Sequence, residues 1–137
     1  MAVIAAARDA GKIRSVGISA VDVGQIERAR AVVPIAAVQN PYNLAERDHD
    51  DVIDHCTEQG IAFVPFYPLH GKDAPAVAEI ARRRGTTTSQ VALAWLLHRS
   101  PAVLPIPGTL SLDHLRDNLA ALEIELEQAE LDALGSR

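Results

Sequence analysis

Cysteine is almost absent from these 137 residues, and so are long apolar runs and any excess of positive charge. The single cysteine, Cys56, cannot form an internal disulfide, which predicts a reducing, cytoplasmic compartment. No stretch approaches the roughly 20 apolar residues of a membrane-spanning helix, so we expect no membrane partner. The formal net charge of −5 leaves no basic surface to meet phosphates, so we expect no nucleic-acid partner.

What the sequence does contain is a repeated unit of an apolar segment followed by a helical pattern. Four segments are apolar through their body and turn polar at the carboxyl end, as a buried strand that ends in a loop does. Such units are typical of a parallel sheet, in which ligands bind at the carboxyl ends of the strands. The four expected strands are Arg14–Ser19, Ile35–Asn40, Ala62–Leu69 and Ala102–Thr109.

The segments between the strands carry helix signals. Asp22 is the expected N-cap of one helix, and Thr87 with Gln90 forms the sequence of a capping box before another. Gly60 and Gly85 stand where a left-handed residue ends a helix. The expected helices are 1–10, Val23–Val32, Asp48–Gln59, Ala74–Arg84, Val91–Arg99, a leucine-rich helix capped by Ser111 or Asp113, and 126–134.

This pattern predicts an α/β fold within one partial domain, residues 1–137. Four parallel β-strands that alternate with α-helices, all on one face of the sheet, would form half of a (β/α)8 TIM barrel. A small doubly wound sheet fits the same order of elements.

Three features that could suggest chemistry have simpler structural interpretations. The acids Asp48, Asp50 and Asp51 complement the positive N-terminus of a helix, and no second ligand group is near them in the sequence, so we expect no metal site. Cys56 lies in a helical pattern and is expected to be a half-buried core thiol. Trp95 lies in an apolar helix and is expected to pack in the core.

Five segments resemble motifs of the aldo-keto reductase family, in the family's order and spacing. They are GKIRSVGIS at 11–19, VQNPYN at 38–43, FYPL at 66–69, QVALAWLL at 90–97, and IPGT at 106–109 followed by LRDNL at 115–119. Members of that family are (β/α)8 barrels that reduce aldehydes and ketones with NADPH. The resemblance runs from Ala10 to the end of the chain, and it corresponds to the family's C-terminal half only.

The resemblance implies no catalytic residue in this chain. The family's catalytic Asp, Tyr, Lys and His lie on the first four strands of the barrel, which have no counterpart here. Tyr42, Tyr67 and Lys72 lie in the wrong segments for those roles. We therefore expect the chain alone to be inactive, because carbonyl reduction needs a proton donor. A small carbonyl substrate would bind only with the other half.

On the nicotinamide side, the resemblance implies four cofactor-binding residues. Ser19 and Gln39 match the residues that hold the nicotinamide amide, and Ala20 stands where the family has Asn. Phe66 matches the aromatic residue that stacks on the nicotinamide ring. Leu69 begins the loop that crosses the pyrophosphate.

On the adenosine side, the resemblance implies five more. Gly108 and Thr109 match the segment at the adenosine phosphate, and Asp117 and Asn118 match the pair that holds the adenine. Many members have a basic residue at the position of Gly108 and an Arg at that of His114. A neutral glycine and a histidine that is charged only part of the time predict NADP(H) or NAD(H) binding with little discrimination between them.

Each of these residues also has a structural interpretation. Ser19 could cap a helix, Gln39 could satisfy backbone groups inside a barrel, and Asn118 could face solvent. Three functions stay open on the residues alone: a portion of an NADP(H)-dependent oxidoreductase, a non-catalytic nucleotide-binding or self-associating half barrel, and an unrelated α/β module. A half barrel leaves two unpaired strand edges, so we expect self-association if it is expressed alone.

Overall fold

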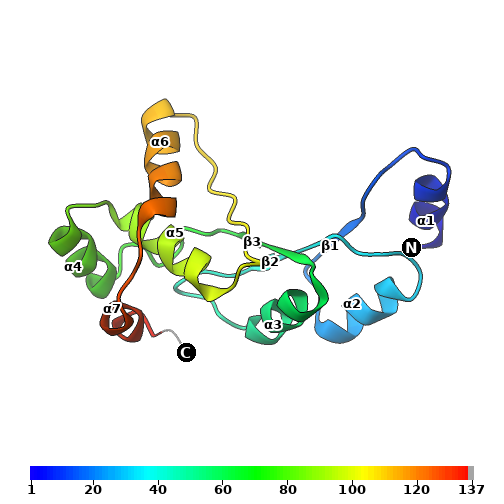
Figure 1. The fold of residues 1–137 in the computed structure, drawn as a ribbon, viewed down its shortest axis with the longest axis horizontal. Coiled ribbons are helices and arrows are strands. Elements are labelled where there is room, and N and C mark those ends of the chain that lie inside the picture. The colour runs from blue at the N-terminus through cyan, green and yellow to red at the C-terminus, as the bar shows by residue number, and fades with distance from the viewer. Residues whose placement is uncertain (136–137) are drawn as a thin grey trace.

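The computed structural model describes residues 1–135, and Figure 1 shows its open arrangement around a small central sheet. α1 and α2 lie at one end of the sheet, and α4 and α7 lie at the other. In chain order the elements are α1 (Ala2–Asp9), β1 (Gly17–Ser19), α2 (Val23–Arg30), β2 (Ala37–Pro41), α3 (Asp50–Gln59), β3 (Ala62–Phe66), α4 (Pro75–Arg84), α5 (Thr88–Arg99), α6 (Leu112–Ala120), η1 (Ala121–Glu123) and α7 (Gln128–Ala133).

The sheet is parallel throughout, with the strands in the order β1-β2-β3. In the central strand, Val38 and Asn40 are fully buried, whereas Gln39 between them is exposed. Successive side chains of a strand point to opposite faces, so the helices cover one face, and the other is exposed at Ser19 of β1 and Gln39 of β2. On β3 the register partner of Gln39 is Val64, which is buried. The sheet confirms the predicted α/β architecture with helices on one face, and it brings all three carboxyl ends to one side of the sheet.

The fourth expected strand, Ala102–Thr109, does not form; a single parallel bridge between Phe63 and Val103 takes its place. Phe63 N–H donates to Ala102 O at 2.8 Å, and Leu104 N–H donates to Phe63 O at 2.8 Å. The next residue of β3 on that side is Pro65, which has no N–H for the carbonyl of Leu104. Proline cannot donate to a ladder, so the pairing ends after one bridge.

The helix ends follow the local signals. Asp22 and Gln25 form a capping box, as do Thr87 and Gln90. Gly60 and Gly85 are left-handed C-caps, each with a φ of 66°. Helix α3 begins at Asp50, two residues later than predicted.

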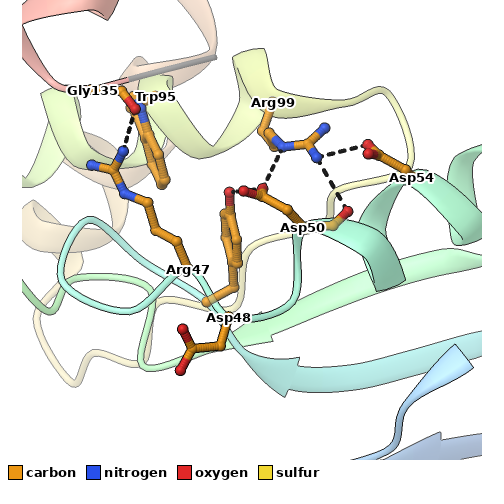
Figure 2. Close-up of a pocket in the computed structure, with 8 residues that line it drawn as sticks. Arg47, Asp48, Asp50, Asp54, Trp95, Arg99 and Gly135 are labelled. Carbon is orange, nitrogen blue, oxygen red and sulfur yellow. Dashed lines mark hydrogen bonds and ion pairs between the residues drawn. The ribbon is translucent and has the colours of Figure 1, made fainter.

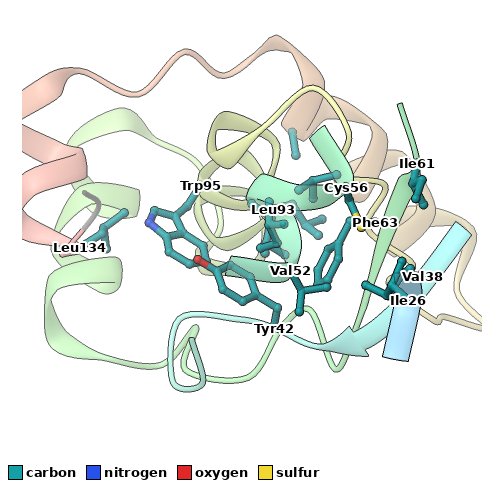
Figure 3. Packing of buried hydrophobic residues seen from close by; sticks show 14 of the residues in the cluster. Ile26, Val38, Tyr42, Val52, Cys56, Ile61, Phe63, Leu93, Trp95 and Leu134 are labelled. Atoms are coloured by element: carbon teal, nitrogen blue, oxygen red, sulfur yellow. The ribbon is translucent and has the colours of Figure 1, made fainter. Parts of the chain in front are cut away.

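Figure 3 shows the core between the helices and the covered face of the sheet. Trp95 is 2% exposed and stacks on Tyr42 with ring centroids 5.7 Å apart, and Tyr42 meets the edge of Phe63 at 6.1 Å. Trp95 is therefore the core residue that its sequence context predicts. Cys56 is fully buried rather than half-buried, and burial raises the pKa of its thiol to about 11.

The C-terminal helix α7 is fastened to α4 by a buried carboxylate. Arg84 donates to both carboxyl oxygens of Glu130, at 2.6 Å for Nη2 and 2.8 Å for Nε. The hydrogen bond from Arg84 holds the pKa of Glu130 below its ordinary value. Leu131 and Leu134 are buried, as predicted.

Candidate functional site

The end of β1 places Ser19 beside Gln39, the central residue of β2, because the two residues are register partners in the parallel ladder. Both side chains are exposed on the same face of the sheet. The amide and hydroxyl groups of this pair can exchange hydrogen bonds with a ligand that lies across the strand ends.

The loop after β1 is held by a residue that the sequence did not single out. Asn40 is fully buried, its Oδ1 accepts from Val21 N–H at 3.1 Å, and its Nδ2 donates to Val21 O at 2.8 Å. Ala20 lies between Ser19 and this clamp with a φ of 55°, a left-handed conformation that alanine adopts only at a cost. The clamp fixes the loop that follows Ser19.

The loop after β3 carries a row of aromatic rings. Phe66 is half-buried and meets Tyr67 edge to face at 5.2 Å, and Tyr67 stacks on His70 at 5.0 Å. Tyr67 is 60% exposed and has a φ of 54°. Non-glycine residues with this φ are uncommon and concentrate at functional sites. The exposed ring of Tyr67 and the partly exposed ring of Phe66 offer aromatic surface at the end of β3.

A cavity of about 350 Å³ lies between this loop and the N-terminal ends of α5 and α6. Its size is in the range of small-ligand pockets. Six of the nine predicted cofactor residues line it. They are Leu69, Gly108, Thr109, His114, Asp117 and Asn118.

Three further residues line this cavity that the sequence analysis did not assign to it: Lys72, Thr87 and Ser89. Lys72 is a cation, and its Nζ lies 2.9 Å from Asp73 Oδ1. Thr87 Oγ1 accepts from Gln90 N–H, which leaves its own O–H free to donate. The one sequence signal that could have assigned Lys72 to the site is its position, two residues after His70 in the same loop.

Ser19, Gln39 and Phe66 do not line this cavity. They lie on the sheet, with Ser19 and Phe66 at the ends of β1 and β3 and Gln39 in the middle of β2. The nine residues therefore form two groups. Leu69 stands in the loop after β3 that connects the two groups. A long ligand with two ends, such as a dinucleotide, matches this division better than a compact one.

A second, larger cavity of about 630 Å³ lies beside the aromatic core and is lined by paired charges (Figure 2). Arg99 donates to Asp50 Oδ1 at 3.0 Å and to Asp54 Oδ1 at 2.7 Å, and Tyr42 Oη donates to Asp50 at 2.6 Å. Burial, with the hydrogen bond to Asp50, raises the pKa of Tyr42 to about 12. Burial lowers the pKa of Arg99, but the hydrogen bonds to Asp54 and Asp50 have the larger combined effect, so the pKa is raised above its ordinary value.

These groups hold α3 to α5, and a phenol with such a high pKa is poorly suited to donate a proton near neutral pH. Asp50 therefore does more than complement the N-terminus of α3, because it also bonds to Arg99 and Tyr42. Within residues 1–135, no group of three or more His, Cys, Asp or Glu side chains is placed to hold a metal ion. None of the described helices is long and apolar enough to cross a membrane.

Comparison with known proteins identifies the family. The family model described as "Aldo/keto reductase family" matches residues 1–74 and 67–136. The chain belongs to the aldo/keto reductase family. This confirms the resemblance seen in the five sequence motifs.

Two curated aldo/keto reductase relatives match most of the chain. Pyridoxine 4-dehydrogenase of Escherichia coli is 42% identical over 137 residues, which are 98% of this chain and 48% of that protein. An uncharacterized oxidoreductase of Schizosaccharomyces pombe is 42% identical over 139 residues, which are 96% of this chain and 45% of that protein. The chain thus spans about half the length of these relatives.

Solved structures of aldo/keto reductases confirm the half-barrel fold. A thermostable aldo-keto reductase in complex with the inhibitor epalrestat superposes with a TM-score of 0.86 at 34% identity, over 96% of this chain and 51% of that one. An aldo/keto reductase from Klebsiella pneumoniae, in complex with NADP and acetate, superposes with a TM-score of 0.84 at 29% identity, over 94% of this chain and 50% of that one.

Proposed function

We propose that this chain is the cofactor-binding, C-terminal portion of a cytoplasmic, NAD(P)H-dependent oxidoreductase that reduces aldehydes or ketones. In this proposal residues 1–137 are part of one domain, and carbonyl reduction requires the rest of the barrel. The observation that carries it is the cavity between α5 and α6, because six residues implied by family resemblance line it together. The presence of NADP in the Klebsiella pneumoniae relative supports the same cofactor.

The residues present fit an adenine nucleotide. Asp117 and Asn118 offer a carboxylate and an amide, which can accept from and donate to the edge of an adenine. Thr109 and the hydroxyls on α5 can donate to phosphate oxygens. When bound, the dinucleotide would supply the hydride. This chain's residues would position it, with Ser19 and Gln39 at the nicotinamide amide and Phe66 against the ring.

The binding test uses two matched acids on helix α6. Asp117 lines the cavity, whereas Asp113 is exposed and pairs with Arg116 at 2.9 Å. We expect Asp117→Asn to weaken binding of 5′-AMP, measured by calorimetry or NMR, and Asp113→Asn to leave it unchanged. Equal effects of the two substitutions, or no binding by the unmodified chain, would argue against an adenine site in this cavity.

The activity test measures NADPH oxidation with a nitrobenzaldehyde. We expect the chain alone to turn over no faster than its Phe66→Ala variant, because none of its residues matches the family's proton donor. Turnover well above that control would mean that a proton donor lies within this chain.

A second candidate function, a non-catalytic half barrel that associates with itself or binds nucleotide only, is favoured by exposed leucines on α6 and η1. Leu112 is 71% exposed, Leu119 is 58% exposed and Leu122 is 64% exposed. Leu119 and Leu122 line one apolar cavity together, and exposed apolar surface is typical of an interaction site. Light scattering tests it: a mass of twice the chain or more supports self-association, and a monomer at high concentration contradicts it.

A further inference from the structure

The phosphate end of the candidate site contains a cation that the family motifs do not predict. At the two positions where basic residues are frequent in the family, this chain has Gly108 and His114. The structure brings Lys72 into the same cavity from a different segment, the loop after β3. Among the described residues that line the cavity, Lys72 is the only permanently charged cation.

The backbone fixes where Lys72 leaves the loop. Gly71 has a φ of 80°, and a Cβ on it would lie 2.9 Å from the backbone nitrogen of Ala45. Lys72 N–H donates to Leu69 O at 3.3 Å, which closes a turn over residues 69–72. The loop therefore packs against residues 44–45, and this close approach sets the starting point of the lysine side chain.

The ammonium group is held weakly and can change partner. Its partner Asp73 is the next residue in sequence, and the Asp73 side chain is 84% exposed. Exposed pairs of this kind contribute little to stability. A dianionic phosphate in the cavity can therefore compete with Asp73 for the ammonium group.

Thr87, the N-cap of α5, and Ser89 in its first turn line the same cavity. The positive end of this twelve-residue helix also favours an anion. A cation, two hydroxyl donors and a helix N-terminus together make up the chemistry of a phosphate site.

We propose that Lys72, assisted by Thr87 and Ser89, selects the 2′-phosphate of NADP(H) over the free 2′-hydroxyl of NAD(H). The inference rests on the proposed function and names a specificity-determining residue of that same site. It assigns to Lys72 the recognition of the 2′-phosphate, for which neither Gly108 nor His114 supplies a permanent positive charge. Discrimination should then persist at pH 8, where an ordinary histidine is neutral.

The experiment compares adenosine 2′,5′-bisphosphate with 5′-AMP on the 137-residue chain at pH 8, by calorimetry. These two probes carry the adenosine half of the cofactor and differ by the 2′-phosphate. We expect the bisphosphate to bind at least about fivefold more tightly, and Lys72→Gln to reduce that ratio to less than about twofold. Asp73→Asn should increase the ratio, because it removes the competing carboxylate. The matched control is Lys12→Gln, since Lys12 is an exposed lysine that does not line this cavity.

The outcomes separate this inference from the function on which it rests. If both probes bind equally and Lys72→Gln changes neither, the adenine site stands and the role of Lys72 is wrong. If Lys72→Gln weakens both probes by the same factor, Lys72 contacts the 5′-phosphate and the assignment to the 2′-phosphate fails. If neither probe binds to the unmodified chain, the proposed function itself fails. Circular dichroism of each variant checks that the fold is retained.

Discussion

Replacing Asn40 by alanine should destabilise the chain and loosen the loop that follows Ser19. The side chain is fully buried and makes two hydrogen bonds, both to the backbone of Val21, at 3.1 and 2.8 Å. Each bond contributes about 1 kcal/mol net, and their loss also leaves a partly buried N–H and a partly buried carbonyl without these partners. We expect the free energy of unfolding to fall by about 2–3 kcal/mol.

Urea denaturation followed by circular dichroism measures this change, and Gln39→Ala is the matched control. Gln39 is the preceding residue on the same strand, but its side chain is exposed, so its loss should cost less than about 0.5 kcal/mol. Asn40→Asp tests the donor alone. It keeps the oxygen that accepts from Val21 N–H, and it replaces the nitrogen that donates to Val21 O with an oxygen. A loss for Asn40→Ala no larger than that of Gln39→Ala would refute the reasoning.

Three further predictions concern backbone strain and the buried thiol. Gly71→Ala should destabilise by more than about 1 kcal/mol, because its Cβ would lie 2.9 Å from Ala45 N, whereas Gly11→Ala, with a similar φ but open space around it, should cost less in the same urea assay. Ala20→Gly should stabilise by about 0.5–1 kcal/mol, because a φ of 55° strains alanine and not glycine; an unchanged unfolding midpoint would contradict this. Cys56, with its pKa raised to about 11, should resist iodoacetamide at pH 8 until the chain is unfolded, and rapid labelling of the folded chain would show that the thiol is accessible.

Sequence reasoning predicted well those parts of the fold, such as helix ends, that depend on only a few neighbouring residues. The capping box of Thr87 and Gln90 spans four residues, and Gly85 ends α4 by its own left-handed conformation. The number of strands was wrong because strand pairing depends on two distant segments. Pro65 is compatible with a strand when β3 is considered alone. In the register with the segment after Ala102, however, residue 65 is the one whose N–H would have to donate to Leu104 O, and proline has no N–H.

For the site, too, the sequence predicted what local motifs encode and missed what depends on distant segments. The motif segments named residues at the strand ends and on α6, and the structure brings most of them to one cavity. Lys72 and Thr87 were not assigned because the cavity joins three segments whose proximity no local pattern encodes. The partner of Asp50 was missed for the same reason, since Arg99 is 49 residues away in the sequence.

The broken fourth strand also limits how two copies of this chain could associate. Because Ala102 and Leu104 bond to Phe63, the alternation of an extended chain turns Val103 and Pro105 to the opposite side. Val103 N–H donates to Ser100 O at 3.1 Å, and Pro105 has no N–H. This edge therefore offers carbonyl acceptors and no backbone donor at either position, so two copies of it cannot pair with each other. A strand that pairs here must supply all the donors, so self-association has to use other surfaces, such as the edge of β1 or the exposed leucines of α6 and η1.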